Sequence, residues 1–95
     1  MSIIRKFNED LNVAVFTTKF ILIDKLPILN VYHHEEDGAW EFTGAQVAKE
    51  KDYMLVSLKK IIDYDHSVLD LVDLPLGSQA HRKDKESPWI FSSAF

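Results

Sequence analysis

Cysteine is absent from this chain of 95 residues, and its absence removes several kinds of chemistry. There can be no disulfide bridge, no thiolate zinc site and no thiol nucleophile. Glycine is scarce too, with three residues, and no Gly-rich loop that could surround a phosphate is formed. No Gly-x-Ser-x-Gly segment occurs, and Ser67 beside His66 is sequence adjacency rather than triad geometry. We therefore expect neither an enzyme nor a bound cofactor.

Positive charge and long apolar runs are also lacking. The formal net charge is −4, whereas a protein that binds a nucleic-acid backbone needs concentrated Lys and Arg. No apolar run approaches the roughly 18 residues of a membrane-spanning helix. Charged side chains appear within the first ten positions, too early for a secretory signal. The expectation is a cytoplasmic protein without nucleic-acid or membrane partners.

Apolar residues, in contrast, are plentiful. They make up 46% of the chain, which is typical of a globular domain. The length suits one domain with a modest core. We expect a single domain over residues 1–95, in which residues 1–12 are an N-terminal extension and residues 13–91 form the core.

The most polar stretch of the chain predicts a β-hairpin over about residues 28–43. Asp37-Gly38 lies between two strand-like segments and favours a two-residue type I′ turn, which would place His34 opposite Glu41. Side chains alternate between the two faces of a strand. The core-facing set is then Leu29, Val31, His33, Glu35, Trp40 and Phe42, and the solvent-facing set is Asn30, Tyr32, His34, Glu36, Glu41 and Thr43.

Short strands and helices are expected around this hairpin. Further strands are predicted over residues 13–18, 53–56 and 78–82, and residues 20–23 could be strand or crossover. Two short helices are predicted, at about residues 57–64 with Ser57 as its cap, and at about residues 67–73 with Ser67 opening a capping box. The fold class is α+β, with a small antiparallel sheet packed against two short helices.

The two histidines of the hairpin invite a metal-site interpretation. Adjacent strand residues point to opposite faces, so His33 and His34 cannot bind one ion without a bulge. The remaining set is His34, Glu36 and Glu41 on the solvent face. One imidazole and two exposed carboxylates are few ligands for a dedicated metal site, so this set is kept as an alternative. His33 is expected beside the core, either as a structural histidine or as a pH-dependent switch.

Four aspartates flank the apolar residues of the two predicted helices and form an acidic ridge: Asp63, Asp65, Asp70 and Asp73. The ridge is either the solvated face of the helices or a docking surface for a basic protein. Arg82 is expected to bind an anion or to pair with one of the aspartates at the surface. Trp89 is either a core residue or an aromatic anchor for a partner. The partner-binding set is therefore Asp63, Asp70, Asp73, Arg82 and Trp89.

A longer pattern runs through most of the chain. Its segments are Val31-Tyr32, Glu35-Glu36, Gly38-Ala39-Trp40-Glu41-Phe42, Val56-Ser57-Leu58, Ile61-Ile62, Asp65-His66-Ser67-Val68-Leu69, and Leu74-Pro75-Leu76-Gly77-Ser78 with Arg82. In order and spacing this pattern resembles the domain of unknown function 2185, also called the immunity protein 33 family, over roughly residues 13–90. The chain departs from the family pattern at His66, where proline is usual, and at His81.

The resemblance implies a small α+β domain associated with bacterial toxin immunity, and it supplies no catalytic residues. The leading hypothesis is thus a non-enzymatic bacterial protein that binds another protein, with a basic toxin as the candidate partner. A homodimer is also possible. The alternative function is a small-ligand-binding or metal-binding domain that uses the His33–Glu41 hairpin.

Overall fold

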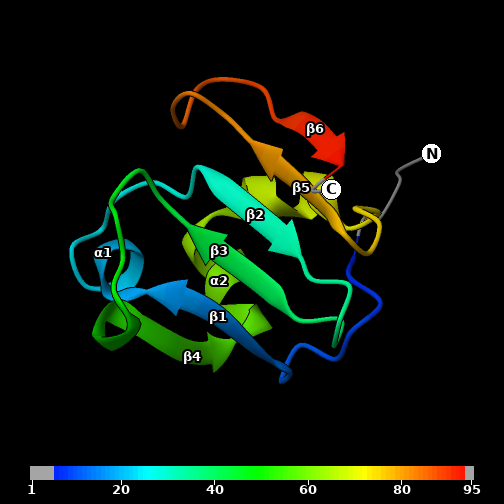
Figure 1. Ribbon diagram of the computed structural model, residues 1–95, viewed down its shortest axis with the longest axis horizontal. Helices are drawn as coiled ribbons and strands as arrows, with labels where there is room; N and C mark the ends of the chain where they lie inside the picture. The colour runs from blue at the N-terminus through cyan, green and yellow to red at the C-terminus, as the bar shows by residue number, and fades with distance from the viewer. Residues whose placement is uncertain (1–5, 94–95) are drawn as a thin grey trace.

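Six strands form a single sheet in the computed structural model, which describes residues 6–93 (Figure 1). The strands are β1 (Ala14–Thr18), β2 (Asn30–His33), β3 (Trp40–Thr43), β4 (Tyr53–Ser57), β5 (Ser78–His81) and β6 (Ile90–Ser93). Their order across the sheet is β4-β1-β3-β2-β5-β6, and every neighbouring pair is antiparallel except β1 and β3. The predicted α+β fold with a largely antiparallel sheet is confirmed.

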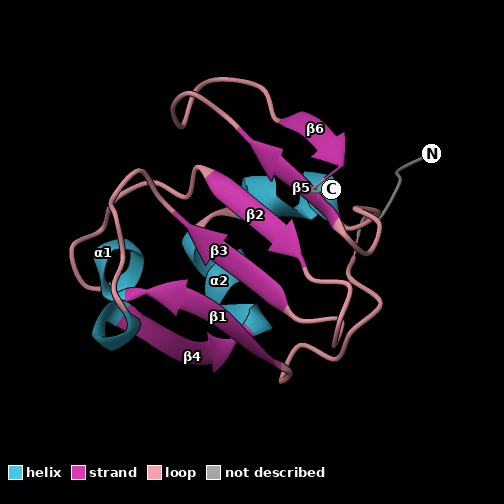
Figure 2. Cartoon of the chain, viewed as in Figure 1, coloured by secondary structure: helices cyan, strands magenta, loops and turns pink. Residues whose placement is uncertain are grey.

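The helices are all short: α1 (Lys19–Leu22), α2 (Leu58–Tyr64), and the 3-10 helices η1 (Glu50–Asp52) and η2 (His66–Leu71). Two of these, α2 and η2, cover the same face of the sheet. Figure 2 shows α2 and the following helix behind the sheet, while the opposite face carries no helix. In the part of the chain that the structure describes, no helix has the length and apolar character needed to cross a membrane.

The expected helix caps are half right. Ser57 caps α2, because its Oγ accepts a hydrogen bond from Lys60 N at 3.2 Å. The second helix begins earlier than predicted and is a 3-10 helix. Its cap is Asp65, which accepts from Ser67 N at 2.9 Å, so the capping box that begins at Ser67 is wrong. Residues 20–23, left open between strand and crossover, contribute to α1 at the start of the crossover.

The core lies between the sheet and the helices. The strands contribute Val15, Val31, Phe42 and Ala80, and the helices contribute Leu58, Ile61, Val68 and Leu71, all buried. The segment expected to be an N-terminal extension also takes part, because Phe7 is buried and forms a T-shaped contact with the Trp40 ring at a centroid distance of 5.0 Å. The strand predicted at residues 78–82 is β5, and residues 90–93 form a further strand, β6, at the edge of the sheet.

The hairpin of β2 and β3 has the predicted faces but not the predicted register. His33 pairs with Trp40 and Tyr32 with Glu41, two positions away from the expected pairs. The turn is longer than two residues, with Gly38 N donating to His34 O at 2.9 Å and Asp37 Oδ1 accepting from Ala39 N at 2.9 Å. Gly38 has a φ of 73°, which suits glycine. The type I′ turn at Asp37-Gly38 is therefore wrong.

Candidate functional site

The aspartates of the predicted acidic ridge differ in their surroundings. Asp63 is exposed on α2 and forms an (i, i+4) pair with Lys59 at 2.7 Å. Asp70 and Asp73 are exposed on and just after η2. Asp65 faces inward instead, with 8% of its side chain exposed. The ridge is therefore made of three exposed aspartates, and the fourth belongs to a buried network.

That network is built around Arg82, which is only 5% exposed. Its Nη2 donates to Asp65 Oδ2 at 2.6 Å, its Nη1 to Ser67 Oγ at 2.9 Å, and its Nε to Ile28 O at 3.0 Å. The guanidinium also lies over the Trp89 ring, 4.1 Å from its centroid. Of the two roles expected for Arg82, the structure shows the pair with an aspartate, although it is buried rather than superficial.

Trp89 is half-buried by the same contacts. Its Nε1 donates to Ser67 O at 3.2 Å, which ties the loop before β6 to the start of η2. The neighbouring Ile90 and Phe91 are exposed. Trp89 and Arg82 therefore link the outer strands to the helical layer.

Two carboxyl groups have pKa values below the ordinary value of 3.8. For Asp65, burial raises the pKa, but the hydrogen bonds from Ser67 and the ion pair with Arg82 together lower the pKa by more than burial raises it. For Asp52, the backbone N–H of Lys49 is the main cause of the lowered pKa, with a contribution from Lys19. A carboxyl with a lowered pKa stabilises the folded state above its unfolded pKa, and this stabilisation disappears as the pH falls through the folded pKa.

We therefore expect the melting temperature to fall as the pH drops from about 5 to about 2. The Asp65→Asn variant should lose less stability over this range, because one of the responsible groups is gone. Asp63→Asn is the matched control, since Asp63 is exposed and its surface pair contributes little. Thermal unfolding followed by circular dichroism measures both. Identical acid dependence in Asp65→Asn and the wild type would contradict this assignment.

His33 is turned toward the core, as the alternation pattern predicts. Its side chain is 13% exposed, and its ring stacks on Trp40 at a centroid distance of 3.9 Å. Nδ1 donates to Leu74 O at 2.7 Å, and Nε2 lies 3.9 Å from Glu9 Oε2. His33 is thus held by the core and is not available to share a ligand with His34.

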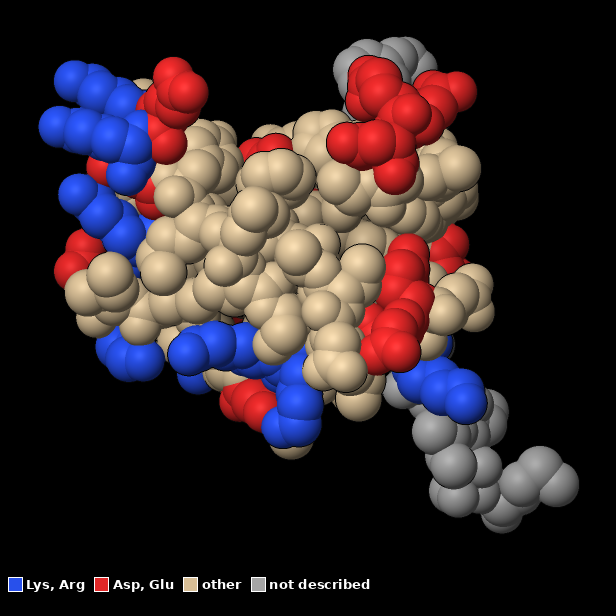
Figure 3. Space-filling view, turned by 90° about the horizontal axis from the view of Figure 1, so that it is seen from below, with Lys and Arg blue, Asp and Glu red and all other residues tan. Residues whose placement is uncertain are grey.

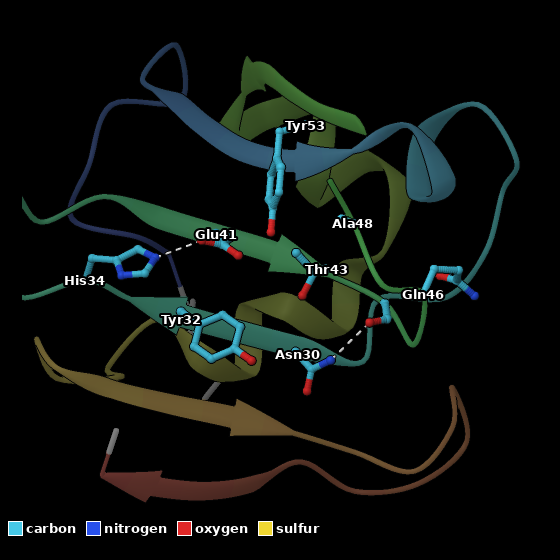
Figure 4. Close-up of a pocket in the computed structure, with 9 residues that line it drawn as sticks. Asn30, Tyr32, His34, Glu41, Thr43, Gln46, Ala48 and Tyr53 are labelled. Carbon is cyan, nitrogen blue, oxygen red and sulfur yellow. Dashed lines mark hydrogen bonds and ion pairs between the residues drawn. The ribbon is translucent and has the colours of Figure 1, made fainter. Parts of the chain in front are cut away.

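A pocket of about 270 Å³ opens on the helix-free face of the sheet (Figure 4). It is lined by Asn30, Tyr32, His34, Glu41, Thr43, Gly44, Gln46, Ala48 and Tyr53. Register explains most of this set, because Asn30 pairs with Thr43 and Tyr32 with Glu41 on the same face. The loop after β3 closes one side. Gly44 fits there because an added Cβ would lie 2.9 Å from Pro27 O and 2.8 Å from Gln46 Oε1.

Glu41 lies in the middle of the pocket lining. Its Oε1 is 2.9 Å from His34 Nε2. In Figure 4 the hydroxyl of Tyr53 points toward Glu41 from one side, and the Tyr32 ring lies on the other. Burial raises the pKa of Tyr53, and the charge and hydrogen bonding of Glu41 raise it further. The arrangement places one carboxylate between two phenol rings.

The proposed metal set is only partly assembled. The structure brings His34 and Glu41 together, but Glu36 lies in the turn and does not line the pocket. Within residues 6–93 there is no group of three or more His, Asp or Glu side chains placed to hold a metal ion. The two tyrosines were not singled out from the sequence, although alternation already put Tyr32 on the solvent face.

No protein-family model, curated protein or solved structure matches this chain.

Proposed function

We propose that this chain is a non-enzymatic protein-binding domain that contacts its partner through the helix-free face of the sheet. One observation carries the proposal: a row of side chains that runs across all six strands on that face. The pairings between strands place these residues in line as Leu55, Phe16, Glu41, Tyr32, Gln79 and Ser92. The row is apolar on β4 and β1 and polar from β3 onward.

The apolar end of the row, on β4 and β1, distinguishes this face from an ordinary solvated sheet. Antiparallel sheets commonly expose one face, but that face is usually polar. Here Leu55 and Phe16 are neighbours and both are exposed. Figure 3, the view from below, shows the β4 side, where uncharged residues, polar and apolar alike, fill the centre and charged side chains lie mainly toward the margins. Exposed apolar side chains that lie together are typical of protein interaction surfaces.

The chemistry of the partner follows from charge. The chain has a formal net charge of −4, so a basic protein would approach it faster than an acidic one. The resemblance to the immunity protein 33 family supports a bacterial toxin as that partner. A second copy of this chain on the same face is the competing occupant.

The proposal predicts that Leu55→Glu abolishes recovery of a stoichiometric partner when the tagged chain is purified from its native host with toxin candidates expressed. A buried charge at the centre of an interface costs several kcal/mol, on the order of a hundredfold or more in affinity. Ile23→Glu is the matched control, because Ile23 is 65% exposed and Leu55 is 63% exposed. Ile23 lies just after α1 and outside the row. Its variant should recover the partner normally.

Three results would contradict the proposal. Recovery of the partner with Leu55→Glu would remove this face as the interface, and absence of any stoichiometric partner would remove the protein-binding function. Sedimentation at several concentrations distinguishes a homodimer from a complex with another protein. A homodimer would dissociate on dilution and would be weakened by Leu55→Glu. A self-associating wild-type chain without another partner would also overturn the proposal.

A further inference from the structure

The pocket on the helix-free face is rich in hydrogen-bond acceptors. Its lining includes the Glu41 carboxylate and the hydroxyl oxygens of Tyr32, Tyr53 and Thr43. Gln46 Oε1 is buried and has no hydrogen-bond partner among the described residues. A ligand that supplies donors can pair with the Glu41 carboxylate and with these oxygens. A carboxylate or phosphate would meet Glu41 with the wrong charge.

Glu41 is also short of positive partners. Its ion pair within residues 6–93 is with His34, and no Lys or Arg of that range lies within ion-pairing distance of its carboxylate. The rings of Tyr32 and Tyr53 stand on either side of it in Figure 4. The faces of aromatic rings attract cations, and a carboxylate at the base of such a pocket adds direct charge pairing.

The pocket is small enough to suit a single side chain, because its volume of about 270 Å³ is near the lower end of the roughly 300–1,000 Å³ of typical small-molecule sites. It also adjoins the apolar end of the row, since Phe16 pairs with Glu41. Arginine fits these conditions better than lysine, because its planar guanidinium carries five donors and no acceptor and stacks on aromatic rings.

We infer that this pocket binds the guanidinium group of an arginine side chain presented by the protein partner. Glu41 pairs with the cation, and the rings of Tyr32 and Tyr53 stack on it. The inference depends on the proposed function, and it assigns a role to each part of the row. Phe16 and Leu55 contact the apolar surroundings of the arginine, while Glu41 fixes its position.

The test is an NMR titration of the labelled chain with N-acetyl-L-arginine methylamide. N-acetyl-L-citrulline methylamide, which has nearly the same shape but no charge, is the matched probe. The arginine compound should shift the signals of Tyr32, Glu41 and Tyr53 saturably, and the citrulline compound should bind at least about tenfold more weakly. Glu41→Gln should lower arginine affinity by about tenfold or more. Glu36→Gln, in the exposed turn, should leave it unchanged.

Several results would overturn the inference. Equal binding of the two compounds would show a site for neutral amides, and shifts that map away from the pocket would place any cation elsewhere. Saturable binding of Zn²⁺ alone that depends on His34, without arginine binding, would favour a metal site. Tyr32→Leu gives a second test if Glu41→Gln alters the amide spectrum. If the arginine compound does not bind but a Leu55-dependent partner is recovered, only the arginine site is wrong. If the arginine compound binds but no such partner is recovered, the protein-binding proposal is wrong.

Discussion

Replacing Arg82 with methionine is expected to lower the free energy of unfolding by about 3–5 kcal/mol. The change keeps most of the side-chain length but leaves the Asp65 carboxylate, which is 8% exposed, without its cation. It also removes the donors that Ile28 O and Ser67 Oγ accept from Arg82. Buried acceptors without donors are destabilising. Urea denaturation followed by circular dichroism gives the free-energy difference.

A second substitution tests whether the buried charge is the cause. Adding Asp65→Leu to Arg82→Met should recover part of the lost stability, because neither charge then remains buried. Lys83→Met is the matched control, since Lys83 follows Arg82 but is exposed, and it should change stability by less than about 0.5 kcal/mol. A loss below about 1 kcal/mol in Arg82→Met would mean that the ion pair contributes no more than a surface pair.

The sequence could not reveal this network, although it contains all of the members. Arg82 and Asp65 are 17 residues apart, and several other aspartates were equally plausible partners. The choice depends on Asp65 being the residue that caps η2, because its carboxylate accepts from Ser67 and also pairs with Arg82. That coincidence is a tertiary fact, because the order of the strands brings the end of β5 beside the start of η2.

The hairpin shows the opposite balance between sequence and structure. Alternation correctly predicts which side chains face the core, because a period of two determines the face of each residue. The register was missed by two positions, and such a slip leaves every face unchanged. The longer turn is stabilised by contacts that the alternation pattern cannot predict. The Asp37 carboxylate accepts a hydrogen bond from Ala39 N, and His33 stacks on Trp40 and does not pair with Phe42.

Part of the pocket lining can be predicted from the sequence. Tyr32, His34 and Glu41 belong to the predicted solvent face of one hairpin, so their proximity follows from alternation and pairing. The position of Tyr53 in the pocket cannot be predicted in this way, because it depends on the strand order β4-β1-β3, in which β1 lies between β4 and the hairpin. Gln46 is in a loop whose path has no periodic signal. Pockets that combine distant strands and loops therefore need the topology.

The second large effect concerns Trp40, which is 2% exposed and joins the N-terminal segment to the sheet. Its Nε1 donates to Glu9 Oε2 at 2.8 Å, its ring forms a T-shaped contact with Phe7, and it stacks on His33. Trp40→Ala should lower the free energy of unfolding by about 3–5 kcal/mol, because it leaves a large cavity in the core. Trp40→Phe should cost less, since a ring is kept and only the Glu9 hydrogen bond is lost.

Hydrogen exchange separates the loss of this local anchor from general destabilisation. In Trp40→Ala the backbone amides of residues 7–10 should lose protection beyond the change in global stability, since Phe7 and Glu9 both contact this ring. Trp89→Ala is the matched control, because Trp89 contacts Ser67 and Arg82 at the other side of the sheet. That variant should be less stable but should keep the relative protection of residues 7–10. Equal loss in both variants would mean that the N-terminal segment follows global unfolding and is not held by Trp40.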